Sequence, residues 1–157
     1  MQIEGLDDLI HQIRTLPEKT TRRTLLKIIR RVTKPVVNAA RHEVAQIQEK
    51  AFSEGRHPTG NLYESIGNIT GKSQEYPNIQ VGARVKRRYK GFHAHLLHDG
   101  TGKRMTKRGY NRGAITRPIP FMQRAFDKTH AQVRPHFENE VAKEVKRIVK
   151  KNIKPTV

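Results

Sequence analysis

The stretch FHAHLLHDGTGKR, residues 92–104, gathers the side chains with the most evident capacity for chemistry. His93, His95 and His98 fall within six positions, and Asp99 follows directly. Imidazole and carboxylate groups are zinc ligands, so the cluster raises the question of a metal centre. We interpret residues 92–98 as a β-strand, where alternate side chains face opposite ways. His93 and His95 would then share a face that His98 does not.

A zinc site needs three or four converging ligands, and no HExxH or similar spacing supplies the remainder. The surrounding lysines and arginines would also repel a cation. We therefore expect no metal and no cofactor, and read the histidines as polar residues of a structural strand. The pair His93 and His95 stays open only as an adventitious chelator.

Other catalytic signals are equally weak. The chain has no cysteine, which excludes a cysteine nucleophile, a thiolate zinc site and disulfides. No serine stands in a GxSxG motif, and DGTGKR lacks the spacing of a phosphate-binding loop. We expect no catalytic residue and a protein that is not an enzyme.

The charge is the strongest compositional signal. Lys and Arg number 32 against 14 Asp and Glu, a formal net charge of +18, which points to a negatively charged partner. Residues 84–117 hold eleven Lys and Arg and one Asp. We expect this segment to face phosphate groups or an acidic protein surface, with a solvated loop as the alternative. The candidate residues are Arg84, Lys86, Arg87, Arg88, Lys90, Lys103, Arg104, Lys107, Arg108 and Arg112.

Helical periodicity dominates both ends of the chain. Residues 1–17 predict a short helix, and residues 18–54 a long one. The apolar line of the long helix passes through Pro35 without losing phase, which favours one bent helix over two. That line is Leu25, Ile29, Val32, Val36, Ala40, Val44, Ile47 and Ala51.

The middle of the chain predicts a sheet over residues 60–98, from strands at 62–69, 79–83 and 92–98. Residues 99–117 predict a long, mobile, basic loop, and 118–152 a C-terminal helix beginning near Pro118 or Pro120. Its predicted apolar line is Met122, Phe126, Val133, Phe137, Val141, Val145 and Ile148.

These elements predict a single α+β domain over residues 1–157. Long N-terminal and C-terminal helices would pack on a small, mainly antiparallel sheet of three to four strands. No apolar run approaches the roughly 20 residues that span a bilayer, and the N-terminus lacks the order of a signal peptide. We expect a soluble protein made in a cytoplasm, with no membrane partner.

Four stretches, in this order, resemble the tail-completion (neck) protein family of long-tailed bacteriophages. IEGLDDL resembles the opening of the family, and PTGNLYESI, residues 58–66, its P-x-x-T-G-x-L-x-x-S-I segment. AHLLHDGT, residues 94–101, is similar to its Y-A-x-x-V-E-F-G-T strand and turn. RPIPFMQRAF, residues 117–126, is similar to its R-P-F-L-R-P-A-F helix start. The chain departs from the pattern at His93, His98 and Asp99, and the basic insert 102–116 is longer than the family leads one to expect.

The resemblance implies a non-enzymatic structural protein of the virion, assembled in the host cytoplasm. Such a protein joins tail to head as a subunit of a neck ring, with six copies implied by the sixfold symmetry of the tail tube. Its partners would be itself, the tail-tube and head-connector proteins, and the DNA that passes through the channel.

Two alternatives remain open from the residues alone. One is a chromatin-like architectural binder that forms no ring. Size and charge also suit a small basic nucleic-acid-binding protein or a ribonuclease toxin, in which His95 would act with Tyr89 or Arg88. The two long helices and the family-like segments argue against this alternative.

Overall fold

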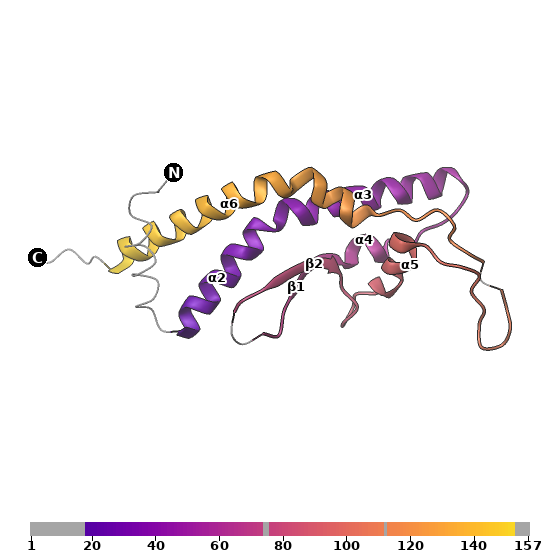
Figure 1. Ribbon diagram of the computed structural model, residues 1–157, viewed down its shortest axis with the longest axis horizontal. Helices are drawn as coiled ribbons and strands as arrows, with labels where there is room; N and C mark the ends of the chain where they lie inside the picture. Colours follow the sequence, from indigo (N-terminus) through magenta and orange to yellow (C-terminus); the bar gives the residue numbers. More distant parts are fainter. Residues whose placement is uncertain (1–17, 74–75, 112, 153–157) are drawn as a thin grey trace, which may run out of the picture. The chain divides into compact units, whose positions relative to one another are not determined.

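The computed structural model describes residues 18–73, 76–111 and 113–152 (Figure 1). Within this part the fold is α+β, with five α-helices, one 3-10 helix and an antiparallel sheet of two strands. The predicted helix over residues 1–17 lies outside the described residues. In chain order the elements are α2 (Glu18–Val32), α3 (Lys34–Ser53), α4 (Asn61–Ser65), β1 (Ile66–Thr70), β2 (Ile79–Ala83), η1 (Gly91–His93), α5 (Ala94–Asp99) and α6 (Phe121–Asn152).

Contacts between residues divide the described chain into two compact units. Unit 1 comprises residues 18–33, 70–79 without 74–75, and 132–152. Unit 2 comprises residues 34–69 and 80–131 without 112. The two are described separately.

The predicted long helix is two helices. Thr33 forms a turn between α2 and α3, and its amide still donates to the Ile29 carbonyl at 2.9 Å. Pro35 has no N–H, and inside a helix its ring would press on the carbonyl four residues earlier. As the second residue of α3, Pro35 sits where no N–H is needed. The prediction of a single bent helix is therefore wrong: α2 ends at Val32, and Pro35 lies in the first turn of a separate helix.

The apolar line of these helices is largely confirmed. Val32, Val36, Ala40 and Val44 are all buried. Ile28, which the predicted line leaves out, is also buried.

The sheet is smaller than predicted. Residues 61–65 form α4, so β1 begins only at Ile66. Residues 94–99 form α5, preceded by η1, so the predicted third strand is wrong. The sequence AHLLH holds good helix formers and no β-branched residue, which explains the helix. α5 ends where Gly100 adopts a φ of 76°, in the region that favours glycine.

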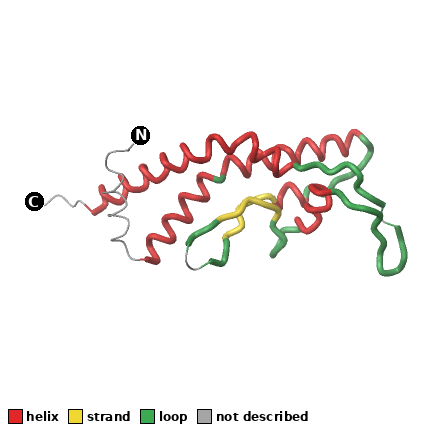
Figure 2. The backbone as a smooth tube through the Cα atoms, viewed as in Figure 1, coloured by secondary structure: helices red, strands yellow, loops and turns green. Residues whose placement is uncertain are grey.

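The core of unit 2 is apolar and draws on α3, α4, β1 and the start of α6. Figure 2 draws the helices of the chain in red and its strands in yellow. Half-buried apolar residues of β2 and α5 pack against it. Its buried members are Val37, Ala40, Val44, Leu62, Ile66, Phe121 and Ala125.

Helix α6 confirms the predicted C-terminal helix, with a corrected buried face. In unit 2 the buried positions are Phe121, Ala125 and Thr129, each four residues from the next. Phe126 of the predicted line is 52% exposed, and Phe137, in unit 1, is 39% exposed. Small residues at the contact set the face, because Ala125 allows close approach where a large side chain would not. Pro135 lies inside the helix, which continues past it.

The interior of unit 1 is partly charged. Ile28 and Val32 of α2 and Val145 of α6 are buried. So are the side chains of Glu140 and Glu144, which form ion pairs with the α2 residue Arg31 at 3.2 and 3.6 Å. None of the described helices is both long enough and apolar enough to cross a bilayer.

Candidate functional site

Residues 101–111 and 113–115, which we call the arm, form a paired ribbon and not the long, mobile loop predicted from the sequence. Antiparallel bridges join Thr101 to Ile115 and Met105 to Asn111. The amides of Thr101 and Ile115 each donate to the other residue's carbonyl, at 2.9 and 3.1 Å. Backbone hydrogen bonds satisfy polar groups that a free loop would leave to water, so they give the glycine-rich segment a defined path.

The arm carries both cations and large apolar side chains on its surface. Lys103, Lys107 and Arg108 are exposed. Met105 and Tyr110 are 65% and 69% exposed, well outside any core. Exposed aromatic residues beside cations are typical of surfaces that bind a partner.

Two other predicted residues of the arm differ from these three. Arg104 is half-buried and has interactions within the protein. Arg112 lies outside the described residues.

Arg84, predicted to face a partner, is built into the fold instead. Its Nε donates to the Ser65 carbonyl and its Nη2 to the Glu64 carbonyl, both at 3.0 Å. Its guanidinium also lies 3.5 Å from the centroid of the Tyr89 ring. The carbonyls at the end of a helix lack intrahelical partners, so Arg84 completes the C-terminus of α4.

The next four cations lie at the surface. Lys86, Arg87, Arg88 and Lys90 are exposed, and Arg87 has a φ of 60°. Arg88 reaches the Tyr89 hydroxyl at 3.5 Å; this hydrogen bond lowers the pKa of Tyr89, while burial partly opposes the shift and nearby positive charge assists it. The same bond raises the pKa of Arg88.

The histidines make aromatic and local contacts. The His98 ring meets Phe121 edge-on at 5.5 Å, and its Nδ1 lies 2.7 Å from Asp99 Oδ1. The His93 ring packs edge-on against Phe92 at 5.2 Å. His95 and His98 lie three residues apart on α5, so they share a helical face, which the strand interpretation excluded. Over the described residues, no three histidine or acidic side chains are placed to hold a metal ion together.

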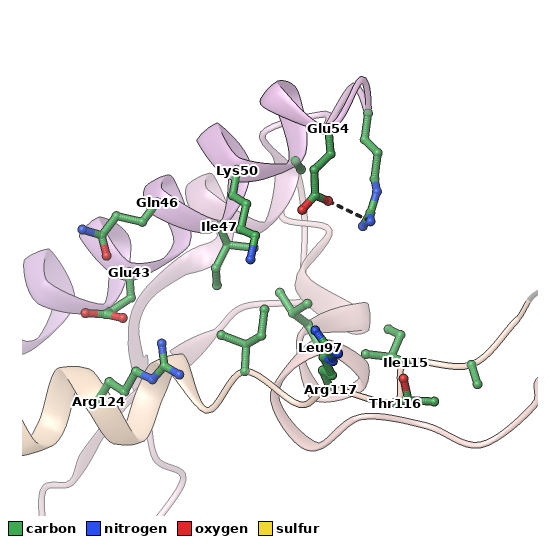
Figure 3. Close-up of a pocket in the computed structure, with 14 residues that line it drawn as sticks. Glu43, Gln46, Ile47, Lys50, Glu54, Leu97, Ile115, Thr116, Arg117 and Arg124 are labelled. Atoms are coloured by element: carbon green, nitrogen blue, oxygen red, sulfur yellow. Dashed lines mark ion pairs between the residues drawn. The ribbon is translucent and has the colours of Figure 1, made fainter.

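A groove of about 620 Å³ in unit 2 was not predicted from the sequence. It runs between one face of α3, the base of the arm and the start of α6 (Figure 3). Apolar residues contribute to its walls: Ile47, Ala51, Leu97, Ala114, Ile115 and Ile119. Charged residues contribute as well: Glu43, Lys50, Glu54, Arg56, Arg117 and Arg124.

The charges of the groove do not cancel. Glu54 pairs with Arg56 at 2.8 Å, and Glu43 pairs with Lys128 just outside the groove. Three exposed cations, Lys50, Arg117 and Arg124, remain without an ion-pair partner among the described residues. Lys50 and Arg124 reach into the space between α3 and α6 from opposite sides (Figure 3).

One signal in the sequence does mark the α3 side of this groove. Glu43, Gln46, Ile47, Lys50 and Glu54 recur at spacings of three and four, as one helical face does. The arm and α6 enter from far along the chain, and no local pattern joins them to α3.

Comparison with known proteins yields no relative: the chain matches no family model, no curated protein and no solved structure.

Proposed function

We propose that this protein is a structural, non-enzymatic component of a bacteriophage virion. It would complete the end of the tail and join tail to head as one subunit of a neck ring. The observation that carries the proposal is the meeting of three of the four family-like segments in the core of unit 2.

The three segments lie far apart in the sequence. Leu62 and Ile66 belong to PTGNLYESI, Ala94 and Leu97 to AHLLHDGT, and Phe121 and Ala125 to RPIPFMQRAF; all six pack in or against one cluster. The Ile119 amide also donates to the Leu97 carbonyl at 2.9 Å, joining the second segment to the third. Because they share one core, the segments behave as a single structural pattern, which supports the resemblance more than three separate matches would.

The arm supplies the surface through which the subunit would act. Its exposed cations would face the DNA in the channel or an acidic face of the tail-tube or head-connector protein. Both contacts are electrostatic, so both should weaken steeply as salt rises.

The test replaces the exposed arm cations together, as Lys103→Gln, Lys107→Gln and Arg108→Gln. A matched control removes three exposed cations of unit 1, as Arg23→Gln, Lys146→Gln and Lys150→Gln. Both variants should melt like the parent. The arm variant should lower head–tail joining, counted as infectious particles from a phage lacking its own copy, by about tenfold or more, whereas the control should not. Equal yields from both variants would refute a role for the arm.

Assembly tests the ring itself. Purified protein mixed with tail tubes should decorate one end with a ring, sixfold by electron microscopy. A compact dimer at every salt concentration, with no binding to tubes, would contradict the ring.

A second candidate is a small basic nucleic-acid-binding protein, or a ribonuclease toxin. The exposed Tyr110 beside the arm cations favours it, because bases stack on aromatic rings along basic surfaces. The ribonuclease form has less support, since no hydrogen bond or ion pair of the described residues joins His95 to Tyr89 or Arg88. RNA cleavage lost in His95→Ala, with no decoration of tubes, would favour this candidate.

A further inference from the structure

We infer that residues 86–90 of unit 2, which we call the basic turn, bind the phosphate backbone of duplex DNA. The inference deepens the proposed function and rests on it for one point, the choice of a duplex, which is the DNA that would pass through a neck. The argument for a phosphate ligand comes from how the fold holds the turn and from what the turn presents.

The fold fixes both ends of the basic turn. The Arg84 amide donates to the Ser65 carbonyl, and the Gly91 amide donates to the Arg84 carbonyl, both at 3.0 Å. Within the turn, the Tyr89 amide donates to the Lys86 carbonyl at 3.3 Å. Gly91 is buried, and a Cβ there would lie 2.6 Å from Ser65 Oγ, so the chain is seated closely where the turn ends. A surface that is already ordered loses little conformational entropy when it binds a ligand.

Tyr89 orders the cations of the turn. Its half-buried ring has the guanidinium of Arg84 3.5 Å from its centroid and that of Arg88 at 5.3 Å. Arg88 also reaches the Tyr89 hydroxyl at 3.5 Å. Cation–π contacts of this kind restrict where an arginine side chain lies, so Arg88 is held in place before a ligand arrives.

The exposed charge of the turn is entirely positive. Lys86, Arg87, Arg88 and Lys90 are exposed, and no described acidic residue forms an ion pair with any of them. The carboxylate of Glu64 acts on Arg88 only at longer range. Four cations within five residues repel one another, and a ligand with several closely spaced negative charges would relieve that repulsion.

Arg87 occupies the strained position of the turn. Its φ of 60° lies in the left-handed region, which glycine adopts far more readily than arginine. Within the described residues, no hydrogen bond or ion pair holds its side chain there. Strained residues are concentrated at binding sites, because stability alone does not favour them. The presence of an arginine at this position therefore points to a ligand outside the protein.

A phosphate backbone fits this surface better than a protein face does. A stable protein interface has an apolar centre from which lysine is depleted, whereas no exposed apolar side chain lies between Lys86 and Lys90. Phosphate oxygens require only cations and hydrogen-bond donors, and duplex DNA presents one such charge for about every 1.7 Å of its axis. Phe92, just beyond the turn, is 65% exposed. Its ring would stack on unpaired bases, so it distinguishes a single strand from a duplex in the test below.

The experiment measures binding of a labelled duplex of about 20 base pairs to the full-length protein by anisotropy, across a salt series. The turn variant is Lys86→Gln, Arg87→Gln and Lys90→Gln. The control variant again carries Arg23→Gln, Lys146→Gln and Lys150→Gln, and so has the same net charge. The turn variant should bind the duplex about tenfold or more weakly than the parent, and its slope of log affinity against log salt should be less steep by about 2.7. The control variant should stay within about twofold of the parent in affinity.

A single substitution keeps the test valid if three together disturb the fold. Arg87→Gly removes one charge and relieves the strained φ, so its melting temperature should be no lower than that of the parent while its salt slope falls by about 0.9. Arg87→Lys keeps the charge and should bind the duplex within about threefold of the parent. A variant Arg87→Gly that binds like the parent would show that the strained arginine serves no ligand.

Two further measurements fix the ligand. Phe92→Ala should leave duplex binding unchanged; a loss as large as that of the turn variant would mean that unpaired bases are bound instead. The loss in the turn variant should also be larger for the duplex than for a labelled polyglutamate peptide of about 20 residues, and the reverse would point to an acidic protein. Equal binding of the duplex by the turn and control variants would overturn the inference. None of these results bears on head–tail joining, which the arm variant tests separately.

Discussion

The two units differ in how much of their interior is apolar and how much is charged. Unit 2 has a mainly apolar core, from Val44 of α3 to Phe121 of α6, and the one buried carboxylate of its described part, Glu43, pairs with Lys128. Unit 1 has only three buried apolar residues in its described part and places two carboxylates beside them. Glu144 receives Arg147 at 2.6 Å and lies 3.9 Å from Lys27, while Glu140 receives Lys143 at 3.0 Å.

The contrast teaches what a very basic chain requires. α2 is rich in lysine and arginine, so an apolar partner alone would leave those charges without compensation. Glu140 and Glu144, one turn apart on α6, compensate the positive charge of α2 through ion pairs with Lys27 and Arg31. The same helix meets α3 with Phe121 and Ala125, where α3 offers apolar side chains.

The largest expected effect on stability is the difference between substituting two phenylalanines of α6. Phe121 is 1% exposed and Phe126 is 52% exposed. Phe121→Ala should cost about 3–5 kcal/mol of unfolding free energy, because it leaves a cavity in the core of unit 2. Phe126→Ala should cost less than about 1 kcal/mol. Urea unfolding followed by circular dichroism measures both, and similar losses would show that the buried face is misassigned.

A smaller effect should appear in unit 1. Glu144→Gln keeps the shape of the side chain and removes the charge that three cations share. It should cost about 1.5–3 kcal/mol, as expected for hydrogen bonds to a charged buried group. Glu138→Gln is the control: its partner Arg134 is exposed, and such a pair contributes about 0.5 kcal/mol or less. Equal losses of unfolding free energy in the two variants would mean that the buried Glu144 carboxylate contributes no more than an exposed ion pair.

Substituting two glycines with alanine tests how closely unit 2 is packed. A Cβ on Gly91 would lie 2.6 Å from Ser65 Oγ and 2.8 Å from the Arg84 carbonyl oxygen. Gly91→Ala should therefore cost about 1–3 kcal/mol. Gly102→Ala, where a Cβ would meet nothing within 4 Å, should change stability by less than about 0.5 kcal/mol. An unchanged melting temperature in Gly91→Ala would indicate a looser core than described.

The smallest effect is the pH dependence of Glu140. The hydrogen bond from Lys143 lowers its pKa below the ordinary 4.5, with Arg31 assisting and burial partly opposing. A lowered folded-state pKa stabilises the protein above the unfolded value and loses that effect as pH falls below about 4.5. The difference in unfolding free energy between the parent and Glu140→Gln should shrink as pH is lowered from about 7 to about 3. A difference that stays constant would mean that the charge of Glu140 does not stabilise the fold.

Helices were the most predictable part of this fold. Long periodic patterns identified α2, α3 and α6, because a single amphipathic face repeats over many turns. The face of α6 was misjudged because large side chains were taken as the buried ones, whereas Ala125 and Thr129 lie at the contact. Residue size alone does not say which side of a helix faces its neighbour.

Short segments were less predictable. The helices α4 and α5 are five and six residues long. Segments this short do not distinguish a helical period from strand-like alternation. The surface cations of the arm followed from composition, whereas the role of Arg84 depends on where α4 ends. The groove could not be predicted from the sequence, because its walls come from three distant segments of the chain.

Two prolines fall beside the borders of the units. Pro35 follows the border at Thr33 and Lys34, and Pro135 follows that at Ala131 and Gln132. Each proline removes one backbone donor, so the carbonyls of Arg31 and Ala131 lose the amide that a regular helix would supply. The backbone hydrogen bonding of the helices is thus weakened near both borders between the units. At these borders the unfolding of one unit need not carry the other with it. Heating should then melt the protein in two steps, with amide exchange in one unit preceding exchange in the other.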